Sequence, residues 1–300
     1  MAGAGTGRLE CRVVAGRVHT AVASAYPLKI ITPLAAQTGP PAGGPQLHPA
    51  VGYLLTYGGG LVHGDIISVH VHVEAQVALV LLTQGSTKVY RTRGGRSKQQ
   101  PAEGAQTVQT LEIAVAPGAL VCVLPDPVTC FENAQYSQRQ RVRMSSTGSL
   151  VLLDWMTSGR MSRGERWCFH RYFSVNVVCD CDGRLAVRDA LLLDNPGPLR
   201  DMDVDAFAYL LVLGPATATV ADVFRTEHRE TRIRPVRAPP ANRFAAVQWS
   251  VSEVDERSAR GVAVRASAAS TATLKAWLVE RLAPLRTAVG DAAWSMFANA

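Results

Sequence analysis

Three consecutive glycines followed by an alternating apolar run restrict the fold of this chain more than any other feature. The stretch reads TYGGGLVHGDIISVHVHV from Thr56 to Val73, and after Asp65 it has the two-residue period of a β-strand. A P-loop would need Lys and Ser or Thr after its last glycine, and a dinucleotide-binding loop would open a helix. We therefore exclude a nucleotide site and expect left-handed turns or close backbone approach at Gly58, Gly59, Gly60 and Gly64.

Strand signals continue through the first two-thirds of the chain. Apolar runs rich in β-branched residues occupy residues 8–30, 51–57, 65–84, 110–131 and 173–193. The run 65–84 fits one long strand or two successive ones. In the run 173–193, Asp182-Gly183 predicts a hairpin, because this dipeptide supplies the positive φ angles of a tight reversal. Polar loops are expected over 35–50, which is rich in Pro and Gly, and over 93–106, which is basic.

Helical spacing appears only near the end of the sequence. Residues 215–230 predict one helix, and residues 270–286 predict another that Ser270 or Thr271 caps. The second helix has one apolar stripe: Leu274, Trp277, Leu278, Leu282 and Leu285. We expect this stripe to pack within the chain rather than to bind a partner. Residues 244–254 and 261–267 predict a further strand pair. The fold class is therefore predominantly β, with about two helices in the C-terminal third.

A length of 300 residues suits one large domain or two small ones. We expect one domain over residues 1–300, with residues 1–15 as a candidate flexible segment, in a cytoplasmic protein. The start MAGAGTGRLECRVV carries charges where a secretory signal needs apolar residues, and no apolar run is long enough to span a membrane. Basic residues exceed acidic ones by 31 − 24 = 7. No aromatic residues are interleaved with the arginine-rich segment near residue 230, so nucleic-acid binding is not expected.

Two groups of side chains have the ligand types of a metal site. His70 and His72 share one face of a strand, with His63 just upstream, and Cys179 and Cys181 flank a hairpin turn. Neither group has a fixed third ligand. We favour the wetter face of a half-buried strand for the histidines, and simple packing for most of the six cysteines.

Known catalytic templates find no match. The chain contains no G-x-S-x-G elbow and no HExxH motif. Candidate acids stand in four separate segments: Asp65, Asp126, Asp154 and Glu165. For each of them, taken alone, we favour a turn cap or a surface charge over a catalytic role. The sequence gives no reason to pair any two of them as acid and base.

Four short segments in fixed order resemble the UreD/UreH family of urease accessory proteins. They are GGGLVHGD, TQGSTKVYR, LPDPVTCFENAQYSQ and DWMTSGRMSRGERW, beginning at residues 58, 83, 124 and 154. The resemblance runs from about residue 16 through the final helix. His70 and His72 lie outside the family pattern.

The resemblance implies a non-catalytic scaffold with a helically wound stack of β-sheets and two helices. Such a protein is a urease maturation chaperone that binds apo-urease and a second, UreF-like accessory protein. Through that protein it meets a nickel-binding, UreG-like GTPase. No cofactor is expected to be tightly bound, and nickel(II) is expected only in transit, through a water-filled passage.

A passage must release its ion as readily as it accepts it, so scattered carboxylates suit it better than a His/Cys chelate. We expect Asp65 and Glu165 to line the passage, with Asp126 as a weaker third candidate. Arg160 and Arg163 are the expected counter-charges when nickel is absent. Pro125 belongs to the motif that contains Asp126.

Lys88, Tyr90 and Arg91 admit two interpretations, snorkelling at a strand end or contact with a partner protein. Two other functions stay open from the residues alone. One is a cytosolic hydrolase or transferase whose acids converge only in the folded chain, and the other is a metal-storage protein.

Overall fold

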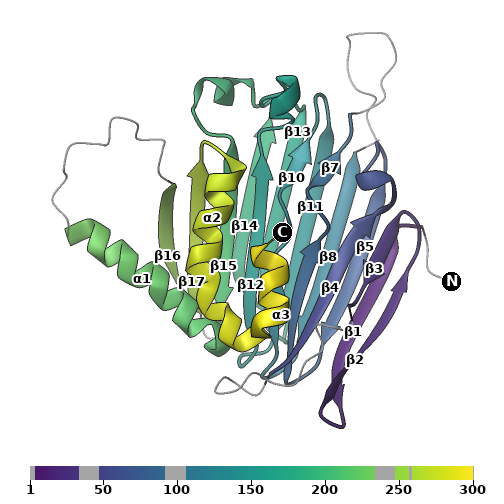
Figure 1. Ribbon diagram of the computed structural model, residues 1–300, viewed down its shortest axis with the longest axis vertical. Coiled ribbons are helices and arrows are strands. Elements are labelled where there is room, and N and C mark those ends of the chain that lie inside the picture. The colour runs from purple at the N-terminus through teal and green to yellow at the C-terminus, as the bar shows by residue number, and fades with distance from the viewer. Residues whose placement is uncertain (1–3, 34–46, 92–105, 234–246, 257–258, 300) are drawn as a thin grey trace.

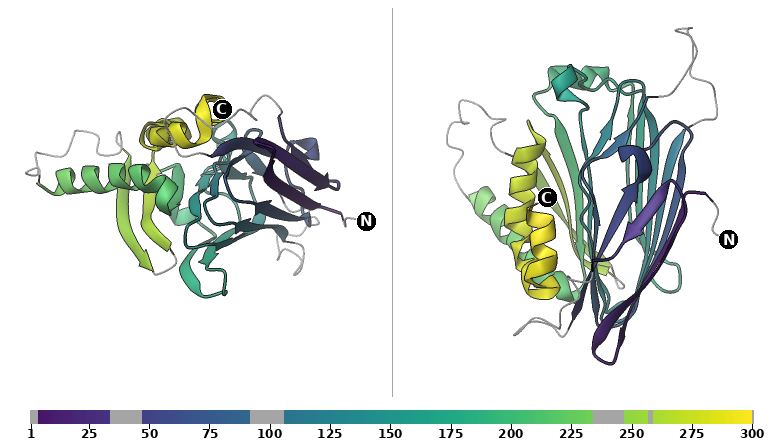
Figure 2. Two further views of the ribbon diagram at one scale, coloured as in Figure 1. Left: turned by 90° about the horizontal axis from the view of Figure 1, so that it is seen from below. Right: turned by 45° about the vertical axis from the view of Figure 1, so that its right-hand side comes forward.

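Two β-sheets and a layer of helices form the computed structural model, in which residues 4–33, 47–91, 106–233, 247–256 and 259–299 are described. The helices all lie against the larger sheet, and the smaller sheet packs on the other side of it (Figures 1 and 2). Within these residues, no helix combines the length and apolar character that crossing a bilayer requires.

The seven-stranded sheet has the order β14-β13-β11-β8-β5-β1-β2. Its strands are β1 (Thr6–Val14), β2 (Arg17–Ser24), β5 (Ile66–Val73), β8 (Thr107–Val115), β11 (Gln135–Met144), β13 (Arg171–Cys179) and β14 (Leu185–Asp194).

The ten-stranded sheet has the order β16-β17-β15-β12-β9-β6-β4-β3, with β10 and β7 paired beside β12. Its strands are β3 (Leu28–Ile31), β4 (His48–Thr56), β6 (Val77–Thr83), β7 (Thr87–Val89), β9 (Leu120–Val123), β10 (Val128–Cys130), β12 (Ser149–Thr157), β15 (Ala206–Leu213), β16 (Gln248–Glu256) and β17 (Ala259–Ala268).

Successive strands wind from one sheet to the other. The chain leaves β4 for β5 in the smaller sheet, returns to β6, crosses again to β8, returns to β9, and repeats this through β11, β12 and β13. Because of this winding, the neighbouring strands in the middle of each sheet are parallel, as in the pairs β5–β8, β8–β11, β6–β9 and β9–β12. The run 65–84 is therefore two strands, and they belong to different sheets. The predicted β-rich fold class and helical winding are confirmed.

Three α-helices cover the outer face of the ten-stranded sheet: α1 (Ala218–Ile233), α2 (Thr271–Leu282) and α3 (Arg286–Ala298). The Ser270 hydroxyl caps α2 by accepting from the backbone N–H of Thr273 at 3.1 Å, and the predicted apolar stripe of α2 is buried. Short 3-10 segments are η2 (Tyr57–Gly59), η3 (Met161–Arg163), η4 (Gly197–Asp201), η5 (Pro215–Thr217) and η6 (Ala283–Leu285). Pro284 ends α2 at η6, and α3, which the sequence did not predict, follows.

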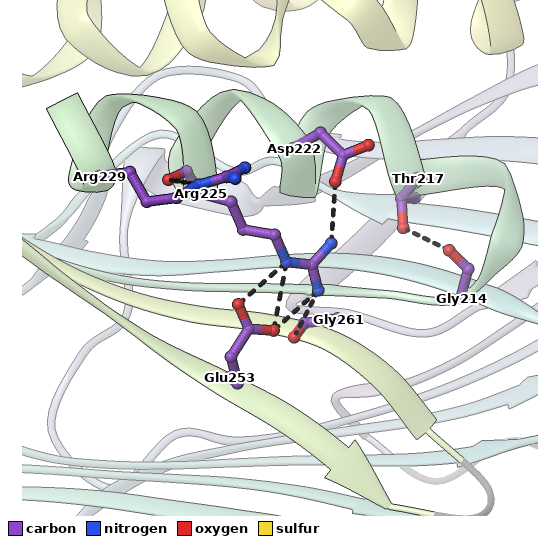
Figure 3. A network of polar contacts seen from close by, with 7 residues as sticks. All are labelled: Gly214, Thr217, Asp222, Arg225, Arg229, Glu253 and Gly261. Carbon is purple, nitrogen blue, oxygen red and sulfur yellow. Dashed lines mark hydrogen bonds and ion pairs between the residues drawn. The ribbon is translucent and has the colours of Figure 1, made fainter.

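Arg225 fixes α1 to the sheet. Its guanidinium donates to both carboxylate oxygens of Glu253 on β16 and to Asp222 on its own helix (Figure 3). It also reaches the carbonyl of Gly261 on β17. These contacts hold α1 against β16, the edge strand of the ten-stranded sheet, so Arg225 has a structural role.

Three boundary predictions need correction. The candidate flexible segment 1–15 includes β1, which lies between β2 and β5 in the sheet. The side chains of Leu9 and Cys11 on this strand are fully buried in the core. The predicted loop 35–50 overlaps β4, which begins at His48 because this end pairs in parallel with Val77 of β6. The predicted reversal after β13 is a longer turn, in which only Gly183 has positive φ and the Asp180 carboxylate accepts two backbone N–H groups. The rest of loop 35–50, apart from Leu47, and loop 93–106, apart from Gln106, lie outside the described residues.

Candidate functional site

A polar layer interrupts the apolar packing between the two sheets. Asp154 stands in the middle of β12, where all nine residues are buried, and is itself only 8% exposed. It faces β11 and β13 of the other sheet, which turn Gln138, Gln140, Ser174 and Asn176 inward. A charge can stay buried here because it has polar neighbours on the opposite sheet.

Four donors converge on the Asp154 carboxylate. Oδ1 accepts from Gln138 Nε2 at 3.1 Å and from the Tyr172 hydroxyl at 3.2 Å. Oδ2 accepts from the Ser174 hydroxyl at 2.5 Å and from Asn176 Nδ2 at 2.8 Å. All four donors come from the seven-stranded sheet. The carboxylate therefore joins the two sheets through charge-assisted hydrogen bonds.

Burial has the largest effect on the pKa of the Asp154 carboxylate. The loss of solvation raises the pKa of Asp154, and the hydrogen bonds from Ser174, Asn176, Tyr172 and Gln138 oppose the rise without cancelling it. A divalent cation beside the carboxylate would favour the ionised form. Binding of a cation would therefore offset part of the free-energy cost of ionising this buried carboxylate.

Asp154 lies between two cavities. A central cavity of about 30 Å³ has Asp154, Asp126, Gln109, Gln138 and Gln140 in its wall. An edge-side cavity of about 470 Å³ opens between β14 and β16 and shares Asp154 and Trp155 with it. In the edge-side cavity, Arg265 of β17 forms an ion pair with Asp189 of β14, which again connects the two sheets.

A third cavity continues the series on the opposite side. This glycine-side cavity of about 320 Å³ includes Gly59, Gly85 and Lys88 in its wall. It shares four residues with the central cavity: Leu54, Thr83, Thr87 and Gln109. The three cavities thus follow one another between the sheets, and the narrowest one contains two carboxylates and three glutamine amides.

Asp126 is the only one of the three predicted passage residues that lines these cavities. Its carboxylate is 3.8 Å from Lys275 Nζ of α2. Burial lowers the pKa of Lys275, while Asp126 opposes this effect. Pro125, the residue before it, accepts a 2.8 Å hydrogen bond from the Trp155 indole through its carbonyl.

Asp65 caps a turn. Its Oδ2 accepts from the backbone N–H of Val62 at 2.8 Å, and its own N–H donates to the Val62 carbonyl. Asp65 is not part of the wall of the three cavities. The structure thus gives Asp65 a local structural role, and its role toward nickel stays a prediction.

Glu165 is also engaged locally. It forms an ion pair with Arg160, and its Oε2 accepts from Arg160 Nε at 2.8 Å and from the Glu132 backbone N–H at 3.3 Å. The hydrogen bond from Arg160 holds the pKa of Glu165 below its usual range. Arg163 is exposed and adds a weaker attraction. The expected pairing of this acid with Arg160 is therefore present, outside the three cavities.

The glycines and the Lys88–Arg91 segment meet at one end of the sheets. Gly58, Gly59 and Gly64 have positive φ, and at Gly60 a Cβ would lie 2.6 Å from the Lys88 carbonyl. Both expectations for the glycines are confirmed. The Tyr90 hydroxyl donates to the Gly58 carbonyl at 3.3 Å. Its ring meets the Phe131 ring edge-on at 5.1 Å.

Arg160 completes this cluster by lying 3.9 Å above the Phe131 ring. We call Gly58–Gly60, Tyr90, Phe131, Arg160 and Glu165 the loop end. Tyr90 is thus a packing residue, whereas Lys88 and Arg91 are exposed beside it. Their contact with a partner stays a prediction.

The histidine and cysteine pairs do not converge on a common point. His70 and His72 are exposed on the outer face of β5, and His70 Nδ1 is 3.3 Å from a Glu112 carboxylate oxygen. Cys179 is buried, whereas Cys181 is exposed. In the described part of the chain, no three His, Cys, Asp or Glu side chains are grouped so that they could hold a metal ion.

Asp154 is the residue that sequence reasoning undervalued. It stood among four candidate acids but was not expected to line a passage. The available signal was its position, since it is the one charge in the otherwise apolar run LVLLDWM. A charged residue inside a strand buried on both faces needs partners across the core.

Comparisons with known proteins cover nearly the whole chain. The family model of the UreD urease accessory protein matches residues 4–297. The chain belongs to the UreD family. Urease accessory protein D of Arabidopsis thaliana is 32% identical over 97% of this chain and 99% of its own length. Urease accessory protein UreD of Anaeromyxobacter sp. is 34% identical, with 96% and 87% covered. Urease accessory protein 4 of Cryptococcus neoformans is 30% identical, with 93% of each chain covered.

Membership in the UreD family supports a role in urease maturation. The relatives are named accessory proteins, which points to a non-catalytic function. Within this UreD fold, the four motif segments border the loop end and the central cavity. The resemblance inferred from the sequence is confirmed.

Proposed function

We propose that this protein is a cytoplasmic urease maturation chaperone that guides nickel(II) between its two sheets toward apo-urease. It binds apo-urease and a UreF-like accessory protein, and through the latter it meets a nickel-binding, UreG-like GTPase. The observation that carries the proposal is the series of three adjoining cavities with Asp154 at its narrowest part. Family membership supplies the urease context.

The chemistry of the central cavity suits transit. Carboxylate and amide oxygens are weaker nickel ligands than clustered imidazoles or thiolates, so an ion that enters can also leave. Asp154 offers one carboxylate and Asp126 a second in the same wall. Gln138 and Gln140 have carbonyl oxygens that can replace water ligands one at a time.

Lys275 acts as the counter-charge of Asp126 when no ion is present. Its ammonium lies 3.8 Å from that carboxylate and 4.0 Å from the Phe297 ring. A cation in the central cavity would compete with this ammonium for Asp126. The competition keeps the affinity for the ion low, as transfer requires.

The proposal gives Asp65 and Glu165 a role outside the cavities. Both lie outside the three cavities in motif segments, and Glu165 belongs to the loop end. We assign them to the approach of the ion or of a partner, with Lys88 and Arg91 as exposed contact residues. Loss of nickel delivery in Asp65→Ala or Glu165→Ala with complexes intact would support this assignment, and unchanged delivery would remove it.

The decisive test of the proposal is co-expression with apo-urease and the other accessory proteins. Asp154→Asn keeps the shape of the side chain and removes its charge. We expect urease to co-purify as before while its nickel content falls about tenfold, the scale of changes around metal ligands. Asp291→Asn, at a position with 78% of its side chain exposed, is the matched control and should leave nickel unchanged. Equal nickel content in both variants would contradict the proposal.

A further inference from the structure

The outer face of the seven-stranded sheet carries no covering layer among the described residues. The three helices pack on the other sheet, and β5 and β11 alternate between buried and exposed side chains. The two sheets differ in this respect, as Figure 2 shows from the side. This face is therefore open to a partner.

Basic side chains gather on the open face through strand register. Arg8 of β1 is opposite His70 of β5, which is opposite Glu112 of β8, which is opposite Arg141 of β11. The next row on the same face lies two residues farther along each strand and consists of Glu10, His72, Ala114 and Arg143. We define the basic face by six basic residues: Arg8, His70, His72, Arg139, Arg141 and Arg143.

A hollow of about 460 Å³ marks the centre of the basic face. Its wall includes Arg8, His70, His72, Glu112, Arg141 and Arg143. A flat sheet with short side chains would offer no such depression. The long arginines at its border can close around an extended ligand from two sides.

The charges on this face are only partly compensated. Arg8 pairs with Glu10, and His70 contacts Glu112. Arg139, Arg141 and Arg143 are exposed, and none of them forms an ion pair with another residue that the structure describes. These three arginines on one strand therefore keep their capacity to bind carboxylates bidentately.

The spacing of the arginines matches an extended acidic segment. Alternate residues of a strand are about 6.8 Å apart, so Arg139, Arg141 and Arg143 form a regular row. An extended peptide with an acid at every second residue repeats at the same distance. Glu10 and Glu112 stand inside the face, and a nucleic-acid backbone would be repelled by them. A protein partner can place its own basic or neutral groups there.

We propose that the basic face binds an extended acidic segment of a partner protein, with Arg139, Arg141 and Arg143 pairing with successive carboxylates. Arg8 and the histidines border the segment on the side of β1. This contact is separate from the cavities, which lie on the opposite face of the same sheet.

A peptide probe tests the inference without urease, so the outcome does not depend on nickel delivery. The probe is a labelled peptide in which glutamate and threonine alternate, and its counterpart has glutamine in place of glutamate. Fluorescence anisotropy with the full chain should show salt-sensitive binding of the acidic peptide only. The variant Arg139→Gln/Arg141→Gln/Arg143→Gln should weaken binding about tenfold.

The matched control is Arg229→Gln/Arg260→Gln/Arg286→Gln, which removes the same charge from other surfaces and should leave binding unchanged. Circular dichroism of both variants checks that they fold. Arg141→Lys keeps the charge at this position, so it should weaken binding less than Arg141→Gln. Equal losses in the two triple variants would overturn the inference. So would a duplex DNA probe that binds more tightly than the acidic peptide at the same ionic strength.

Discussion

The ten-stranded and the seven-stranded sheet arise from one winding of the chain but have different surroundings. Strands β6, β9 and β12 are buried almost throughout, because helices cover one face and the other sheet covers the second. Strands β5 and β11 expose every second side chain in their later parts. Each crossing of the chain thus moves it between a doubly covered layer and a singly covered one.

This difference explains where polar residues can be placed. In the seven-stranded sheet, β11 points arginines outward and Gln138 and Gln140 inward. In the ten-stranded sheet, Asp154 is the charge inside β12, and it requires four donors from across the core. The winding therefore places a polar layer between the sheets and basic charge on the open face.

The largest expected effect compares the outer faces of the two sheets. Leu153→Ala removes a fully buried side chain that packs toward the helices, and we expect a loss of about 3 kcal/mol in the free energy of unfolding. Arg141→Ala on the outer face of β11 should cost less than about 0.5 kcal/mol. Urea titrations measure both. Similar losses would show that the two sheets are covered alike.

A smaller effect concerns the polar layer. Asp154→Ala leaves Gln138, Ser174, Asn176 and the Tyr172 hydroxyl without their shared acceptor, so we expect a loss of about 2 kcal/mol near neutral pH. Asp291→Ala, whose side chain is exposed, is the control. A stability equal to that of the unchanged protein would mean that water or a shift of the sheets replaces the carboxylate.

The smallest effect is a pair of opposite pH dependences. Burial raises the pKa of Asp154, so the native state holds that proton more tightly than the unfolded chain, and the contribution of Asp154 to stability declines as pH rises from about 4 through the raised pKa. The pKa of Glu165 is lowered, so its contribution is present above about pH 4.3 and disappears as pH falls through the lowered pKa.

The free energy of unfolding is measured over this pH range for the unchanged protein and for Asp154→Asn and Glu165→Gln. The difference between the unchanged protein and Asp154→Asn should decrease as pH rises, whereas the difference from Glu165→Gln should increase. For Glu165 the full difference should stay below about 1 kcal/mol, because the pair with Arg160 is near the surface. Parallel pH profiles would contradict the assigned environments.

The sequence predicted the β-rich class, the glycine turns and the capped helix α2, because each depends on local periodicity or local turn chemistry. It left open whether the run 65–84 is one strand or two, although its first half alternates and its second half contains the continuously apolar segment VALVLL. That change of pattern is the local trace of a chain passing from the singly covered sheet to the doubly covered one.

The candidate site was less accessible from the sequence. Asp65 and Glu165 were chosen for their motifs, but the structure engages them with Val62 and Arg160. The neighbours of Asp154 lie 16 to 22 residues away in the chain, on β11 and β13 of the facing sheet. No local pattern encodes this long-range pairing. The predicted helix 270–286 ran past Pro284, but α2 ends at Leu282, because proline cannot continue the helix. The next helix, α3, was hidden by Gly290, which interrupts it.

Passage of nickel between the sheets is tested most directly by closing the junction of two cavities. Thr87 lines both the glycine-side and the central cavity, and Thr226 is exposed on α1. In urease co-expressed with the accessory proteins and isolated with this chain, we expect Thr87→Trp to lower the nickel content per active site by about tenfold or more, while Thr226→Trp leaves it unchanged. Full nickel content in urease matured with Thr87→Trp, with the indole shown to fill the junction, would contradict the account.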